Sequence, residues 1–184
     1  MGFFAPEFDG QVTVDRLPDD FAARIQHRVE TGLLVPGRRD RANYRVTAID
    51  PDTVTFVAEG FLTTYNIGLN EVTVRRSGRN QVAYHVSYMG WTRIAVGHGA
   101  VIGIAFLLGY ILFPALRASV TSYPAGAVLC SVIVGFFSLA WPWILTAFHR
   151  RFAERALQGI LTATLSGPPA HVSDPRTEER RYAS

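Results

Sequence analysis

Residues 94–148 read IAVGHGAVIGIAFLLGYILFPALRASVTSYPAGAVLCSVIVGFFSLAWPWILTAF and contain a single charged residue, Arg117. A helix needs about 20 apolar residues to cross the hydrocarbon core of a bilayer. The segments on either side of Arg117 are each long enough, which predicts helices at about 94–116 and 125–147. The connector between them is short, so the two helices must run antiparallel. Residues 93–148 are therefore predicted to form a transmembrane hairpin.

The distribution of arginine predicts the orientation of this hairpin. Basic residues near the ends of a span favour the cytoplasmic side. Arginines cluster before the first predicted helix and after the second, whereas the connector has Arg117 alone. The flanking residues are Arg75, Arg76, Arg79, Arg93, Arg150, Arg151 and Arg155. Both termini are expected in the cytoplasm. The use of arginine without lysine fits a GC-rich genome, and the membrane is expected to be a bacterial cytoplasmic membrane.

Residues 1–92 are predicted to form a soluble α+β domain, an antiparallel sheet with one helix. Alternation of apolar and polar side chains predicts a strand at 11–15, and apolar spacing of four predicts a helix at about 19–31. The alternation in 44–58, interrupted by the turn at Asp50, predicts a β-hairpin. Further strands are expected over 61–69, 71–76 and 81–89.

Small residues recur at intervals of four in both predicted transmembrane helices. They are Gly99, Gly103, Ala105, Gly109, Ala127, Ser131 and Gly135. Small residues let helix backbones approach closely, and this packing holds helices together in lipid. Two interpretations stay open. The two helices of the hairpin use these positions against each other, or some positions also receive a helix of another subunit.

Aromatic and basic residues at the cytoplasmic ends of the two helices are typical of membrane-interface anchors. The predicted anchors are Trp91, Arg93, Trp141, Trp143, Arg150 and Arg151. Pro142 lies between two of these tryptophans and should kink the second helix, because proline lacks a backbone donor.

The chain beyond the hairpin divides into two parts. Residues 149–166 carry apolar side chains at helical spacing opposite a charged side. They predict an amphipathic helix at the membrane interface, lying on the inner membrane surface or against the soluble domain. Residues 167–184 contain Pro168-Pro169 and a charged run, and are expected to form a disordered tail.

Two histidines are the candidate cofactor ligands. His98 is the strongly polar group of the first predicted helix, and His149 lies at the cytoplasmic end of the second. A histidine inside a membrane is costly and is a functional-site candidate. Both belong to the same leaflet, which allows a shared haem, metal or chlorin site. The competing interpretation is that each imidazole bonds a nearby carbonyl or headgroup, and it is the one we favour.

The other polar residues do not indicate a catalytic or cofactor-binding site. His85 and Ser87 share a strand face, but local spacing places no carboxylate beside them, so a polar surface is expected. Cys130 is the single cysteine and is expected to be a small buried residue. No glycine-rich phosphate loop, CxxC or HExxH occurs in the sequence. An enzyme is not expected, and a net charge of +3 does not favour nucleic-acid binding.

Three functional hypotheses follow. The first is a non-enzymatic accessory subunit that docks by its hairpin and cytoplasmic domain onto a larger membrane protein complex, respiratory or photosynthetic among the candidates. Its partners are membrane lipids and other integral membrane subunits. The second is a membrane-tethered module for a lipid or apolar ligand. Its pocket would be lined by Phe56, Phe61, Tyr65, Tyr84 and Tyr88. The third is a haem- or pigment-bearing subunit that uses His98 and His149.

Overall fold

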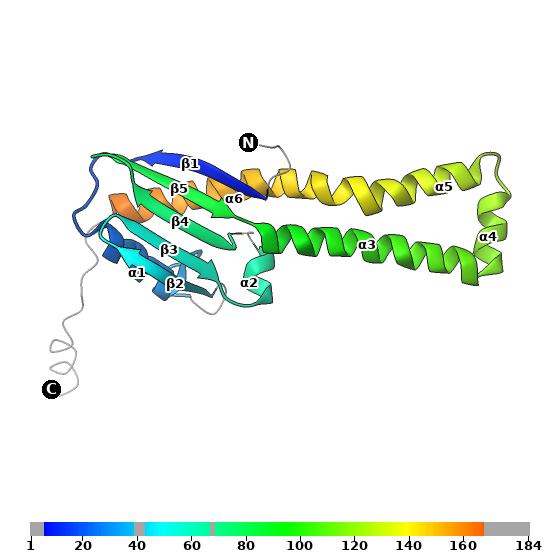
Figure 1. Cartoon of the computed structure of the whole chain (residues 1–184), viewed down its shortest axis with the longest axis horizontal. Helices are drawn as coiled ribbons and strands as arrows, with labels where there is room; N and C mark the ends of the chain where they lie inside the picture. Colours follow the sequence, from blue (N-terminus) through cyan, green and yellow to red (C-terminus); the bar gives the residue numbers. More distant parts are fainter. Residues whose placement is uncertain (1–5, 39–42, 67–68, 168–184) are drawn as a thin grey trace, which may run out of the picture.

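The computed structural model describes residues 6–38, 43–66 and 69–167, except the side chains of residues 65 and 66. Within these residues a five-stranded antiparallel sheet has the order β1-β5-β4-β3-β2 (Figure 1). The strands are β1 (Glu7–Thr13), β2 (Tyr44–Asp50), β3 (Thr53–Ala58), β4 (Glu71–Arg76) and β5 (Gln81–Ser87). The predicted antiparallel sheet is therefore present. Its first strand begins before residue 11, because pairing with β5 extends from Glu7 to Thr13.

Alternation along the strands gives the sheet one buried face. Strand β4 shows this most simply, with Val72 and Val74 buried and Glu71 and Arg75 exposed. Because successive side chains of a strand point to opposite faces, each strand contributes every second residue to one core. The same alternation places the polar side chains together on the other face.

Two helices cover the buried face. Helix α1 (Phe21–Gly32) inserts Phe21, Ile25 and Val29, each at most 2% exposed. The end of helix α6 (Trp141–Ser166) inserts a second apolar stripe beside it. This stripe consists of Ala153, Leu157, Leu161 and Leu165. The core of the domain therefore combines the start of the chain with residues that follow the hairpin, as the crossing of α6 behind the sheet shows in Figure 1.

The strand expected over 61–69 is wrong. After Ala58 the chain turns at Gly60, whose φ of +83° favours glycine, and forms the short helix α2 (Phe61–Asn66). The Thr63 hydroxyl accepts a hydrogen bond of 3.1 Å from the Asn43 backbone N–H, which ties α2 to the chain before β2. After α2 the chain returns to the sheet with β4.

A long helical arm extends from the sheet domain. We define the arm as α3 (Met89–Leu112), α4 (Pro114–Thr121), α5 (Gly126–Gly135), the π-helical segment η2 (Phe136–Ala140) and α6 as far as Phe148. Helix α3 ends four residues before the predicted end at 116, because Pro114 lacks a backbone donor and Phe113 is extended. The predicted connector accordingly contains most of α4 instead of being a loop. Between Gly126 and Ser166 the helix is continuous for 41 residues.

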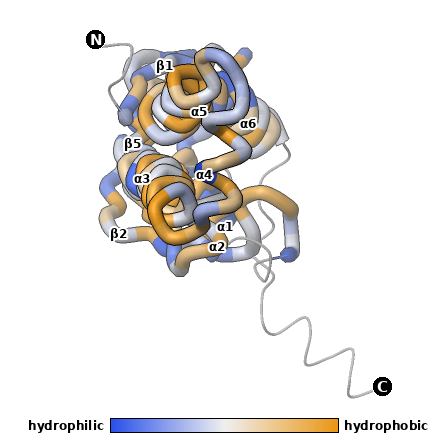
Figure 2. Tube along the Cα trace, turned by 90° about the vertical axis from the view of Figure 1, so that its right-hand side faces the viewer, coloured by the Kyte–Doolittle hydropathy of each residue, from blue (hydrophilic) through white to orange (hydrophobic). Residues whose placement is uncertain are grey.

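Two helices of the arm are long and apolar enough to cross a membrane, Met89–Leu112 and Gly126–Ser166. The most apolar 18-residue window of each is only 11% and 6% buried, which is unlike the core helix of a soluble domain. Figure 2, seen from the α4 end, shows hydrophobic residues around α3 and α5. Leu139, for example, is 73% exposed.

Residues 149–166 are helical, and of the two predicted positions they take the one against the sheet domain. They continue α6 without a break and pack against the sheet. The apolar stripe expected to lie on lipid or on the soluble domain is used for the domain core, where Leu157 is completely buried. Of the predicted tail, residues 168–184 lie outside the described residues.

Candidate functional site at the junction of the arm and the sheet domain

The start of α3 is fixed to the sheet domain by Asn70. The Asn70 side chain accepts a hydrogen bond of 3.0 Å from the Trp91 backbone N–H and donates one of 3.1 Å to the Thr64 carbonyl oxygen. The first backbone N–H groups of a helix have no partner inside the helix, so this amide acts as a cap supplied from a distant segment. Local sequence around Trp91 does not reveal this contact.

The second helix of the arm is fixed at the same level. The His149 imidazole stacks on the Trp91 indole with a centroid distance of 4.3 Å and an interplanar angle of 10°. Trp91 is 8% exposed, so it packs inside the junction and does not serve as the interface anchor that was predicted. Arg93 and Arg151 are exposed near this level, as are Trp141 and Trp143 farther along the arm.

Two of the predicted small positions hold the arm together. A Cβ atom at Gly99 would lie 2.6 Å from Pro142 Cγ, and one at Gly103 would lie 2.5 Å from Ser138 Oγ. A side chain at Gly99 would also lie 2.7 Å from the Ser138 carbonyl oxygen and would require the second helix to move, whereas one at Gly103 would displace the Ser138 side chain. Segment η2 lies directly before Pro142, where the missing backbone donor of proline disturbs regular α-helical bonding.

The remaining small residues do not all share that role. Ala105, Ala127 and Ser131 are exposed, and nothing lies within 4 Å of a Cβ atom placed on Gly135. A Cβ atom on Gly109 would make an ordinary contact of 3.5 Å with Leu116. The structure therefore assigns internal packing to Gly99 and Gly103 and leaves a surplus of small residues on the surface of the arm.

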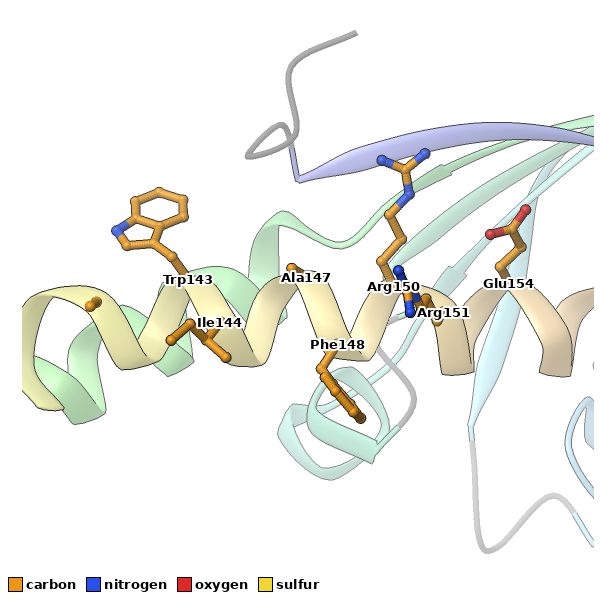
Figure 3. Close-up of a pocket in the computed structure, with 8 residues that line it drawn as sticks. Trp143, Ile144, Ala147, Phe148, Arg150, Arg151 and Glu154 are labelled. Atoms are coloured by element: carbon orange, nitrogen blue, oxygen red, sulfur yellow. The ribbon is translucent and has the colours of Figure 1, made fainter. Parts of the chain in front are cut away.

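A groove follows one side of α6 where the arm meets the sheet domain (Figure 3). Its volume is about 870 Å³. Its apolar end lies on the arm, and Arg150, Arg151 and Glu154 line its other end. The Arg150 guanidinium lies over the Phe8 ring of β1, with Cζ 5.6 Å from the ring centroid. Sequence reasoning selected both arginines as anchors but did not predict the Arg150–Phe8 contact, because Phe8 and α6 meet only in the folded chain.

His98 and His149 have different surroundings. His98 is exposed on α3, and its Nδ1 lies 3.0 Å from the Ile94 carbonyl oxygen one turn earlier. His149 stacks on Trp91 at the junction. The favoured interpretation, an imidazole bonded to a nearby carbonyl, describes His98. Within the described residues, no group of three or more His, Cys, Asp or Glu residues is arranged to hold a metal ion.

The aromatic residues predicted to line a ligand pocket belong to different parts of the structure. Phe56, Tyr84 and Tyr88 are at most 2% exposed in the core, whereas Phe61 is 64% exposed on α2. The side chain of Tyr65 lies outside the described residues. Burial raises the pKa of the Tyr84 hydroxyl, and Gln158 of α6 donates a hydrogen bond of 2.9 Å to the same oxygen. Phe56, Tyr84 and Tyr88 therefore pack the domain core, whereas Phe61 does not.

The open face of the sheet carries a cluster that sequence reasoning missed. His85 Nδ1 lies 2.7 Å from Asp9 Oδ1, and His85 Nε2 lies 3.8 Å from Glu7 Oε2. Pairing of β1 with β5 places these carboxylates beside the histidine, although they precede it by more than 70 residues. Both ring nitrogens face an acid, so the imidazole is not presented to the Ser87 hydroxyl as a base. The Thr55 and Thr73 hydroxyls bond each other at 3.1 Å on the same face.

Comparison with protein-family models, with curated proteins and with solved structures found no match to this chain. The function is therefore argued from the junction, the arm and the open sheet face alone.

Proposed function

We propose that this chain is a two-pass integral membrane protein of a bacterial cytoplasmic membrane. We also propose that it acts as a non-enzymatic accessory subunit, which docks onto a larger membrane protein complex. The observation that carries the proposal is the continuity of α6. One helix leaves the apolar arm and becomes part of the core of the sheet domain through Leu157 and Leu161. A domain joined in this way has a fixed orientation relative to the arm, whereas a flexible linker would let it reorient.

The dimensions of the arm support the membrane placement. Residues 126–149 correspond to about 36 Å of helix at 1.5 Å per residue, against a hydrocarbon core of about 30 Å. The exposed apolar side chains of α3 and α5 would be costly in water over such a length. The arginines flanking the domain end of the arm favour a cytoplasmic sheet domain, with Arg117 of α4 on the other side.

Docking would use the open face of the sheet together with the exposed small residues of the arm. The centre of this face is polar around Thr55, Thr73 and His85. Small residues such as Ala127 and Ser131 would let a partner helix approach the arm closely. Because α6 fixes the orientation of the sheet, one partner could contact both surfaces at once.

The test is affinity purification of the full chain from native membranes in a mild detergent, followed by identification of integral membrane proteins that copurify. Thr73→Arg adds a long charged side chain at the centre of the open face and should abolish the copurification. The matched control is Ala23→Arg on the exposed side of α1, behind the sheet, which should preserve it. Migration of the wild-type protein as a free monomer, or equal loss in both variants, would exclude this docking role.

A further inference from the structure

The groove on α6 combines an apolar end with a basic end on one stripe of the helix. Ala140, Ala147 and Glu154 follow one another at intervals of seven residues, and Trp143 and Arg150 share the same interval. Residues seven apart lie close to the same side of an α-helix. Figure 3 shows Trp143, Ala147, Arg150 and Glu154 projecting to the same side. The groove therefore runs along the helix axis, from the apolar arm towards the sheet domain.

The basic end lies at the depth of the headgroup layer if the arm crosses a bilayer. Contacts between the helices set this level, since Trp91 stacks on His149 and Gly99 faces Pro142. Arg150 follows His149 and therefore lies at the level of the start of α3. From Trp143 to Arg150 the helix advances about 10 Å. The headgroup layer on each side of the hydrocarbon core is roughly 5–7 Å thick, which is less than this advance.

The two arginines are arranged for an anionic group. Arg150 is held by the Phe8 ring, so its guanidinium needs little further ordering. In the part of the chain that the structure describes, neither Arg150 nor Arg151 forms an ion pair with a carboxylate. Glu154 is the acidic residue of the groove and lies one turn farther into the domain. Guanidinium groups bind phosphate oxygens through paired N–H donors.

We propose that this groove binds one anionic phospholipid, with the phosphate at Arg150 and Arg151 and an acyl chain along Ala147 and Ala140. The inference rests on the proposed membrane placement and is independent of docking to a partner complex. The volume of about 870 Å³ lies in the range of small-molecule sites, which is about 300–1,000 Å³. The small side chains of Ala140 and Ala147 leave space for an acyl chain on the helix surface. Two arginines that only anchored the helix at the interface would not need this space.

The experiment is native mass spectrometry of the full chain in a mild detergent, titrated with phosphatidylglycerol or with phosphatidylcholine of the same acyl chains. We expect stronger retention of phosphatidylglycerol. Replacing both Arg150 and Arg151 by Gln should lower that retention at least about tenfold, because it removes both guanidinium donors to the lipid phosphate. Replacing both by Lys should preserve most of the preference and controls for folding.

Two controls distinguish lipid binding in the groove from a general attraction of anionic lipid to basic residues on the surface. Arg93→Gln removes a charge at the same level of the arm, outside the groove, and should change retention less than twofold. Ala147→Phe fills the groove without changing charge and should lower the retention of both lipids, whereas Ala127→Phe on α5 should not. Equal effects of Arg93→Gln and the double Gln variant, or no effect of Ala147→Phe, would overturn the proposal. Carbonate extraction of membranes tests the placement of the arm separately.

Discussion

Tyr84 of β5 reaches across the strand β1 and accepts a hydrogen bond of 2.9 Å from Gln158 of α6. This path exists because its pairing partner on β1 is Gly10. A Cβ atom on Gly10 would collide with the Tyr84 hydroxyl and ring. The glycine therefore lets an aromatic side chain of the sheet contact the helix that continues into the arm.

Gly10→Ala should destabilise the sheet domain. The added methyl group must displace Tyr84, and overpacking of this kind typically costs about 1–3 kcal/mol. Gly78→Ala is the matched control, because a Cβ atom there makes an ordinary contact of 3.8 Å with Gln81. Chemical unfolding followed by circular dichroism measures both free energies. Equal stability of the two variants would contradict the role of Gly10.

Two buried tyrosines should respond in opposite ways to loss of the hydroxyl. Tyr84→Phe removes the bond from Gln158 and should lower the free energy of unfolding by about 1 kcal/mol. Among the described residues the Tyr44 hydroxyl is buried without a hydrogen-bond partner. Tyr44→Phe should therefore leave stability unchanged or raise it by up to about 1 kcal/mol. A larger loss in Tyr44→Phe than in Tyr84→Phe would contradict this contrast.

Stability should fall in alkaline solution. Burial raises the pKa of Tyr44 above the ordinary tyrosine value of about 10, and it raises the pKa of Tyr84 as well. The unfolded chain therefore loses these protons at lower pH than the folded chain. The stabilising effect is complete below about pH 10 and is lost as the pH rises through the folded pKa. Unfolding at pH 9 and at pH 11 should differ less in Tyr44→Phe than in the wild type. The control is Tyr123→Phe, at an exposed position.

Packing of α6 on the sheet should contribute strongly to the domain. Leu157 is completely buried, so Leu157→Ala should cost about 2–5 kcal/mol. Phe152→Ala, five residues earlier on the exposed side of α6, should cost far less. Hydrogen exchange of β1 and α1 would report the difference, because both elements border this stripe. Unchanged protection in Leu157→Ala would show that the sheet folds without α6.

The arm should depend on Gly103 but not on Gly97. A side chain at Gly103 meets Ser138 Oγ, whereas nothing lies within 4 Å of a Cβ atom on Gly97. Gly103→Leu should therefore separate α3 from η2 and lower the thermal stability of the detergent-solubilised protein, while Gly97→Leu should not. The measurement is tryptophan fluorescence during heating. An equal shift in both variants would argue that each glycine meets a partner outside this chain.

The orientation of the arm is testable with introduced cysteines. In a Cys130→Ser background, Ser122→Cys lies after α4 and Ser77→Cys lies between β4 and β5, both at exposed positions. A membrane-impermeant maleimide added to intact spheroplasts should label position 122 and spare position 77. Lysis should make both positions reactive. Labelling of position 77 before lysis would place the sheet domain on the outer side.

Composition was enough to predict the arm, because a long apolar stretch with one charge has few stable alternatives. Alternation predicted the strands, since it reports burial on one face of a sheet. The strand over 61–69 was wrong because the chain turns at Gly60 into a short helix, which a hydrogen bond joins to Asn43, distant in sequence. An amphipathic stripe at 149–166 fits lipid or protein equally well, so only the folded domain shows which surface it covers.

The site was less predictable than the fold. Arg150 and Arg151 stood out as basic residues near a membrane end, but the contact that holds Arg150 needs Phe8 of β1 beside α6. Asp9 and Glu7 approach His85 only through strand pairing. Asn70 caps α3 across a gap of 21 residues. Each of these contacts depends on long-range topology, which local spacing does not encode.

The position of α6 in the chain has a consequence for biosynthesis. The ribosome completes all five strands before it makes Leu157, Leu161 and Leu165, which finish the core of the same domain. Both apolar helices are translated between these two events. The nascent sheet must therefore wait, with part of its apolar face uncovered, until the end of α6 has been translated. If the arm crosses a membrane as proposed, maturation of the domain would report its insertion, and a chain that stalls after α3 would present an incomplete core to proteases.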